Sequence, residues 1–268
     1  MYLIDTHTHV YDAVFDLDRD AVVRHALDAG VGMMLLPNVD ASTIAPMLAF
    51  HEQFPDCTRV MMGLQPEEVR GDYKKVLSLM EKELFETNSS QSLCPQPPVH
   101  YVAVGEVGLD FYWDRTFEKE QLDAFEAQID WAKQLRLPVS IHCRNAFDAM
   151  VKVLEKKQDG SLFGVMHCFT GTEEEAKAYL SLGFHLGLGG VVTYKNCGVK
   201  DFLPNLPIER MVLETDAPYL SPIPHRGKRN EPVFMLDTAK RIADILQISV
   251  ENLAETTATN AKEVFQIN

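Results

Sequence analysis

Residues 2–9 read YLIDTHTH, a short apolar run followed by two histidines that are separated by one residue. An apolar run of this kind predicts a strand that is buried on both faces. In a doubly wound open sheet that binds a dinucleotide, a glycine-rich phosphate loop would follow the first strand. Here the chain continues as DTHTHVYD (residues 5–12). The stretch therefore favours a barrel, with the doubly wound open sheet as the alternative.

Eight such apolar runs recur along the chain, and segments with helical periodicity separate them. The ends of the runs lie about 25–40 residues apart, which is the length of a strand and a helix with their loops. Helical periodicity is clear in 117–135, 147–157 and 173–183. Eight alternating units in 268 residues predict one α/β domain, a (β/α)8 TIM barrel that spans residues 1–268. The predicted strands are 2–7, 31–37, 59–64, 101–106, 138–143, 163–168, 184–189 and 210–216.

One stretch departs from this alternation. Residues 86–98, ETNSSQSLCPQPP, are rich in Ser, Gln and Pro. This composition predicts a surface-loop insertion before the fourth strand, and we assign it no function. The tail after residue 231 returns to a helical pattern.

The composition argues against several classes of protein. No apolar run approaches the roughly 20 residues that a bilayer-spanning helix needs, so we expect no membrane association. The formal net charge of −14 argues against extensive duplex binding but permits an enzyme that holds a few nucleotides. The five cysteines form no C-x-x-C pair, which argues against a disulfide framework or a zinc ribbon and fits the cytoplasm. No feature indicates an obligate protein partner.

Metal-binding residue types stand at the ends of the predicted strands. In a TIM barrel the carboxyl ends of the strands form one rim, where active sites lie. A single histidine at a strand end is more often a structural residue than a ligand, so the hypothesis depends on how many of these residues coincide with strand ends. The six candidates are His7, His9, Glu106, His142, His167 and Asp216.

The chemistry of these six side chains predicts a binuclear centre. Imidazole and carboxylate together suit Zn, Mn, Fe or Co, and carboxylates also accept Mg. Six ligands exceed the three that a single catalytic zinc takes from a protein, so two divalent ions that share Glu106 as a bridge fit better. Such a pair can hold the attacking water and the leaving oxygen of a phosphodiester. Asp216 would bind a metal ion and act as the general base.

Basic and aromatic residues follow the same strand ends. Arg226, Lys228 and Arg229 lie in a loop after the eighth strand, and we expect them to bind substrate phosphate. The alternative is a solvated loop that pairs with its own carboxylates, at Glu231 or Asp237. Arg144 directly follows the fifth strand and either contacts phosphate or pairs with a carboxylate.

Three further sets of residues have open roles. The aromatic cluster Phe111–Trp113 could stack on a terminal base, and Asp110 and Tyr112 could orient ligand imidazoles. Glu214 lies deeper in the barrel than Asp216 and needs a partner that the sequence does not identify. Cys143 and Cys168 follow histidines and are expected to be small buried residues.

Six segments together resemble the TatD-type metal-dependent deoxyribonucleases of the amidohydrolase-like barrel superfamily, from residue 2 to at least residue 232. The resemblance implies ligation by the same six residues and hydrolysis of DNA phosphodiester bonds, mainly as an exonuclease on single-stranded ends. It implies Mg, Mn or Zn as the metal. The segments are DTHTHVYD (5–12), GEVGLDFYW (105–113), IHCRNAF (141–147), MHCFTGT (166–172), LETDAPYL (213–220) and PHRGKRNEP (224–232).

The chain departs from this family at one motif. After the third strand the family usually carries G-x-H-P-H, whereas this chain reads MGLQPEEV (62–69), with Gln65 and Glu67 in place of the histidines. The added negative charge disfavours a polyanion and leaves the substrate open. Two alternatives remain: an amidohydrolase or esterase that acts on a small or nucleotide-linked substrate, and a metal-stabilised barrel without catalysis.

Overall fold

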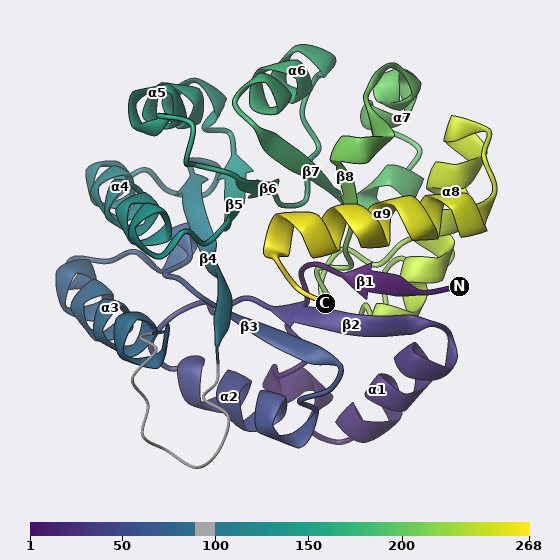
Figure 1. The fold of residues 1–268 in the computed structure, drawn as a ribbon, viewed down its shortest axis with the longest axis horizontal. Coiled ribbons are helices and arrows are strands. Elements are labelled where there is room, and N and C mark those ends of the chain that lie inside the picture. The colour runs from purple at the N-terminus through teal and green to yellow at the C-terminus, as the bar shows by residue number, and fades with distance from the viewer. Residues whose placement is uncertain (89–99) are drawn as a thin grey trace.

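The computed structural model describes residues 1–88 and 100–268. Its eight strands form one parallel sheet in the order β1 to β8, with helices between successive strands (Figure 1). The prediction of a single TIM-barrel domain is confirmed, and the open doubly wound sheet is wrong. The strands are β1 Leu3–Asp5, β2 Val31–Leu36, β3 Thr58–Met62, β4 Tyr101–Asp110, β5 Val139–Arg144, β6 Gly164–Met166, β7 Phe184–Leu188 and β8 Met211–Leu213.

Backbone hydrogen bonds between the first and last strand regions close the barrel. The N–H of Thr6 donates to the carbonyl of Leu213 at 3.0 Å. The N–H of Asp216 donates to the carbonyl of His7 at 2.9 Å. These two bonds place the segment after β8 beside the segment after β1.

The helices surround the sheet, except that α9 lies across one end of the barrel (Figure 1). A capping box begins α6, where Thr172 accepts the N–H of Glu175 and the Glu175 side chain accepts the N–H of Thr172. The periodic segments 117–135, 147–157 and 173–183 correspond to α4, α5 and α6. The helices are α1 Arg19–Asp28, α2 Ile44–Gln53, α3 Tyr73–Asn88, α4 Glu118–Leu135, α5 Phe147–Lys157, α6 Glu173–Ser181, α7 Val199–Phe202, α8 Met235–Leu246 and α9 Val250–Phe265.

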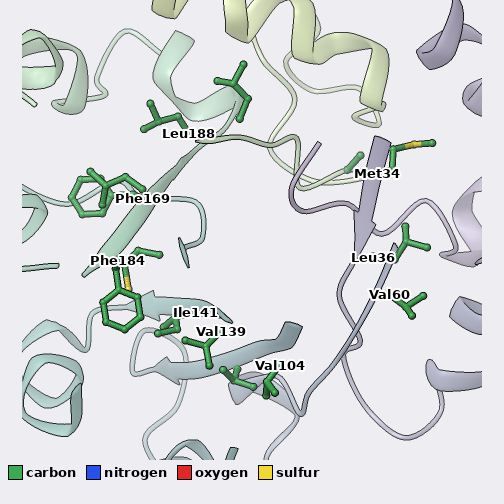
Figure 2. Packing of buried hydrophobic residues seen from close by; sticks show 14 of the residues in the cluster. Met34, Leu36, Val60, Val104, Val139, Ile141, Phe169, Phe184 and Leu188 are labelled. Carbon is green, nitrogen blue, oxygen red and sulfur yellow. The ribbon is translucent and has the colours of Figure 1, made fainter. Parts of the chain in front are cut away.

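Alternate residues of the strands face two separate hydrophobic clusters. In β2, Met34 and Leu36 belong to the larger cluster between the sheet and the helices (Figure 2). Their neighbours Met33 and Leu35 belong to a smaller cluster with apolar side chains of β1, β3, β4, β6 and β8. Because side chains alternate across a strand, the smaller cluster fills the inside of the barrel.

Helix α9 closes this inner cluster. Ala258, Ala261, Val264 and Phe265 pack against the strand side chains within it. The inside of the barrel is therefore apolar and covered at the end where α9 lies. Polar side chains at the carboxyl ends of the strands occupy the opposite end, where TIM-barrel sites form.

The boundary of the expected insertion needs a correction. Residues 86–88 are the last residues of α3 and so are helical, not loop. The rest of the expected insertion, 89–98, lies outside the described residues. Among the described residues, no helix combines the length and the apolar character that a membrane crossing requires.

Truncation of Phe265 tests the role of α9 as the cover of the barrel. Phe265 is 1% exposed. We expect Phe265→Ala to lower the free energy of unfolding by about 3–5 kcal/mol, because it leaves a cavity in the inner cluster. Glu263→Ala, at an exposed site on the same helix, should change it by less than about 0.5 kcal/mol. Denaturant unfolding measures both, and equal effects would contradict the packing role.

Candidate metal centre

The six side chains predicted at strand ends converge at the rim opposite α9. His7 and His9 lie two and four residues beyond β1, and Glu106 and His142 lie within β4 and β5. His167 follows β6, and Asp216 is three residues beyond β8. Three overlapping groups place ligand atoms within 4.8 Å of one another: His7, His9 and Glu106; Glu106, His142 and His167; His7, His167 and Asp216. Their role as metal ligands stays a prediction.

Glu106 lies between two sets of imidazoles. Its Oε2 atom is 3.4 Å from His7 Nε2 and 3.9 Å from His9 Nε2. Its Oε1 atom is 3.0 Å from His142 Nδ1. The two oxygens of one carboxylate therefore face different nitrogen donors, as a carboxylate that bridges two cations would.

Asp216 completes the cluster from the last strand. Its Oδ1 atom is 3.6 Å from His9 Nε2, 3.9 Å from His7 Nε2 and 3.7 Å from His167 Nε2. Its backbone has a φ of 58°, a left-handed conformation that costs energy in a residue other than glycine. The hydrogen bond from its N–H to His7 holds this conformation and aims the carboxylate at the imidazoles.

Each imidazole has its outer nitrogen close to a polar side chain. A ligand histidine usually bonds its second nitrogen to a neighbouring group, which fixes the orientation of the ring. This arrangement leaves the opposite nitrogen of each ring facing the cluster. The outer contacts are His7 Nδ1 with Ser140 Oγ at 3.2 Å, His9 Nδ1 with Tyr11 Oη at 3.1 Å, His142 Nε2 with Asp110 Oδ2 at 2.8 Å and His167 Nδ1 with Glu214 Oε1 at 3.0 Å.

An unsatisfied nitrogen supports a cation site. Within residues 1–88 and 100–268, His7 Nε2 is buried and has no hydrogen-bond partner. A buried polar atom normally has a partner, and this one faces two carboxylates. The rings of His7 and His167 also stack with centroids 3.4 Å apart. The donor set of imidazole nitrogens and carboxylate oxygens therefore fits divalent cations.

The charges of the cluster are coupled. Burial opposes charge on His142, but hydrogen bonds with Asp110 and Glu106 outweigh burial and raise the pKa of His142 to about 10. Burial also opposes charge on His167, yet Glu214 raises its pKa to about 9. Burial alone would raise the pKa of Glu106, but the adjacent imidazoles of His142 and His7 hold it well below its ordinary value. A cation that binds here must therefore displace protons.

The structure gives Glu214 the partner that the sequence could not identify. Glu214 Oε1 accepts the N–H of Cys168 at 2.5 Å and faces His167. A Cβ atom on Gly187 would lie 2.3 Å from Glu214 Oε2, so glycine at this position leaves space for the carboxylate. Asp110, in contrast, follows the expectation from sequence and holds His142.

The predicted phosphate-binding residues differ in what they contact. Arg144 is exposed and lies over the ring of Tyr112, and it lines a cleft of about 1080 Å³ that reaches His167. Arg226 and Lys228 are exposed, and Arg226 lies over the ring of Tyr194. These three positions are open to a substrate, so their roles stay predictions.

Arg229 is engaged within the protein. Its guanidinium pairs with Asp18 at 2.7 Å and with Glu231 at 2.9 Å. This is the alternative that the sequence left open, with Glu231 as one partner. The contacts weigh against Arg229 as a phosphate ligand and indicate that it joins the rim loop to the segment before α1.

Gln65 and Glu67 form hydrogen bonds with one another beside the rim. Gln65 Oε1 accepts the N–H of Glu67 at 2.8 Å, and Gln65 Nε2 donates to Glu67 Oε2 at 3.1 Å. Neither belongs to the groups that could hold a metal ion among the described residues. The replacement of the usual histidines thus leaves the six-residue cluster complete.

Comparison with known proteins identifies the family. The family model described as TatD related DNase matches residues 4–266. The chain is 33% identical to the uncharacterized metal-dependent hydrolase YabD of Bacillus subtilis, over 99% of this chain and 100% of that protein. It is 35% identical to the 3′-5′ ssDNA/RNA exonuclease TatD of Escherichia fergusonii, over 99% of this chain and 100% of that protein.

A solved structure agrees with this result. The crystal structure of YJJV, a TatD homologue from Escherichia coli K12, matches with a TM-score of 0.87 at 27% identity. The match covers 99% of this chain and 98% of that chain. Sequence and fold thus match along the full barrel, and the resemblance seen in the motifs is confirmed. The chain belongs to the TatD-related DNase family of metal-dependent hydrolases.

Proposed function

We propose that this protein hydrolyses phosphodiester bonds at single-stranded ends of DNA, with two divalent cations held by the six-residue cluster. The observation that carries the proposal is the position of Glu106. One of its oxygens faces His7 and His9, and the other faces His142. The family supports phosphodiester hydrolysis, since one relative is a 3′-5′ ssDNA/RNA exonuclease.

The residues divide into two sets around Glu106. His7 and His9 would hold one cation on the Oε2 side, and His142 and His167 would hold the other on the Oε1 side. Asp216 Oδ1 lies near imidazoles of both sets. When bound, Mg, Mn or Zn would supply Lewis-acid polarisation of the phosphoryl oxygen and of the attacking water.

Asp216 is suited to accept the proton of the attacking water. Its side chain is 14% exposed, compared with 5% for Glu106, so it is the more accessible of the two carboxylates. Glu106 is enclosed by imidazoles and holds them in position. The general base and the bridging carboxylate are therefore different residues, although both contact the same histidines.

Exposed basic residues would hold the phosphates of the strand. Arg144 lines the cleft that reaches His167, and Arg226 and Lys228 lie on the loop beyond β8. A guanidinium can donate two parallel hydrogen bonds to a phosphate. These cations would partly offset the negative charge that Glu67 and the net charge of −14 present to a polyanion.

The proposed activity depends on the cations and on both carboxylates. We expect metal-stripped protein to be inactive on end-labelled single-stranded DNA and to regain activity with Mg, Mn or Zn. Asp216→Asn should lower kcat/KM by about 10²–10⁴-fold, the contribution of a positioned acid–base group. Glu106→Gln should lower kcat/KM as well, because it weakens the hold on both cations. Nucleotide release measures the activity, and thermal unfolding checks that the variants remain folded.

Glu251→Gln, at an exposed site on α9, is the matched control and should retain full activity. An ester and amide panel belongs in the same assay, because the cleft is also lined by carboxylates of α6 that suit a substrate without phosphates. Turnover of esters or amides alone would contradict the nuclease proposal. Activity of metal-stripped protein would contradict the metal requirement.

The contact between Glu214 and His167 gives a second expectation. Glu214→Gln keeps the size of the side chain but weakens its hold on the imidazole. We expect cation affinity to fall by about 10–100-fold, as when the outer partner of a ligand histidine is lost. Competition with a chromophoric chelator measures the affinity. Glu209→Gln, at an exposed site, is the control. Equal cation affinities of the two variants would contradict a role of Glu214 in the cation site.

A further inference from the structure

Three side chains on the rim form a group with open stacking surfaces. Tyr112 and Trp113 follow β4, and Arg144 ends β5. The guanidinium of Arg144 lies 3.7 Å from the ring centroid of Tyr112 and 5.4 Å from that of Trp113. The two rings meet edge to face at 4.7 Å. We name Tyr112, Trp113 and Arg144 the rim platform.

The rim platform exposes aromatic surface to solvent. Trp113 is 71% exposed and Tyr112 is 48% exposed. Burial of a large aromatic side chain stabilises a folded protein, so such side chains normally pack in the interior. The other tryptophan, Trp131, is 4% exposed. Trp113 therefore offers a free ring face beside a cation.

A single carboxylate links the rim platform to the metal centre. Asp110 Oδ2 holds His142 Nε2 at 2.8 Å, and Asp110 Oδ1 accepts the N–H of Tyr112 at 2.9 Å. In addition, the N–H of Phe111 donates to the carbonyl of Arg144 at 2.9 Å. A group seated on the rim platform would consequently lie at a fixed position relative to the cluster.

The charges around the cleft limit how far a nucleic-acid strand can extend beyond Arg144. Arg144, which belongs to the rim platform, and Arg115 are the two arginines that line the cleft among the described residues. Six carboxylates also line the cleft and would repel a continuing chain of phosphates. The cleft thus suits one nucleotide at the end of a strand better than a strand that passes through. These carboxylates are Glu118, Asp148, Glu173, Glu174, Glu175 and Asp201.

We propose that the rim platform binds the unpaired terminal nucleobase of a nucleic-acid strand, with Trp113 stacking on the base and Arg144 contacting its phosphate. This proposal rests on the proposed nuclease function and names how that site recognises an end. Aromatic stacking accepts any base, because every base has a π-face. A base inside a duplex is stacked on both faces, and a terminal paired base offers only its outer face while its partner strand stays attached. An unpaired terminal base is free of both constraints, so the rim platform favours single-stranded ends.

Hydrolysis tests the proposal directly. The substrates are single-stranded oligonucleotides whose terminal nucleotide, at either end, is intact or lacks its base. We expect the wild-type protein to show a KM about tenfold or more lower for the intact end, which is the effect of one base–aromatic stack. Trp113→Ala should remove this difference and Trp113→Phe should largely restore it. Tyr2→Ala is the matched control, an exposed tyrosine before β1 that lies beneath the cation of Lys262.

A binding measurement that needs no catalysis accompanies the hydrolysis assay. With the metal chelated, we expect dAMP to quench the fluorescence of the exposed Trp113 and deoxyribose 5-phosphate to leave it unchanged. Buried Trp131 is the only other tryptophan in the chain, so loss of the change in Trp113→Phe assigns the signal.

The outcomes separate the two proposals. Hydrolysis of intact and abasic ends with equal KM, or a preference that persists in Trp113→Ala, would overturn the rim platform and leave the nuclease function standing. Quenching by dAMP without hydrolysis of any nucleic acid under any metal would overturn the nuclease function and support base binding at the rim platform.

Discussion

The rim depends on the buried contact between Asp5 and Thr215. Asp5 accepts the N–H of Thr215 at 2.9 Å and its hydroxyl at 2.5 Å, and it also accepts the N–H of His7 at 3.3 Å. The contact joins residues that are 210 positions apart. Burial raises the pKa of Asp5 to about 8 against these hydrogen bonds. Because this side chain ties the end of β1 to the end of β8, His7 and Asp216 meet in one cluster.

The six-residue cluster and its neighbours concentrate groups that a core would otherwise exclude. Glu106, Glu214 and the imidazole of His7 are almost fully buried, and burying ionisable groups costs free energy unless they are paired. The contacts at the outer nitrogens of the imidazoles offset part of this cost and orient the rings at the same time. The left-handed backbone conformation of Asp216 is a further energetic cost. Such local costs are expected where function, rather than stability, decides the residue.

The sequence was informative where the physics is local. Buried parallel strands are continuous apolar runs, so their number and approximate positions could be predicted from the sequence. The six side chains of the cluster lie at or near the carboxyl ends of these runs, although β4 continues to Asp110, past Glu106. The strands are shorter than those runs in places, as in β1 and β8, because the chain leaves the ladder to form the rim. The start of the expected insertion was placed at residue 86, inside α3, because the Ser-, Gln- and Pro-rich stretch directly follows that helix in the chain.

Contacts between segments that are distant in the chain could not be predicted from the sequence pattern. The pairing of Glu214 with His167 joins β8 to β6, and Arg229 reaches Asp18 across 211 positions. No periodicity or spacing encodes such pairs, since they depend on how the barrel closes. The orientation of Tyr112, Trp113 and Arg144 likewise follows from the position of β4 beside β5.

The central claim is that Glu106 bridges two cations, and anomalous diffraction from crystals grown with Mn²⁺ or Zn²⁺ tests it most directly. We expect two anomalous peaks about 3.5–4 Å apart, one on each side of the Glu106 carboxylate. One should lie against His7 and His9, and the other against His142 and His167. A single peak, or peaks remote from Glu106, would contradict the claim.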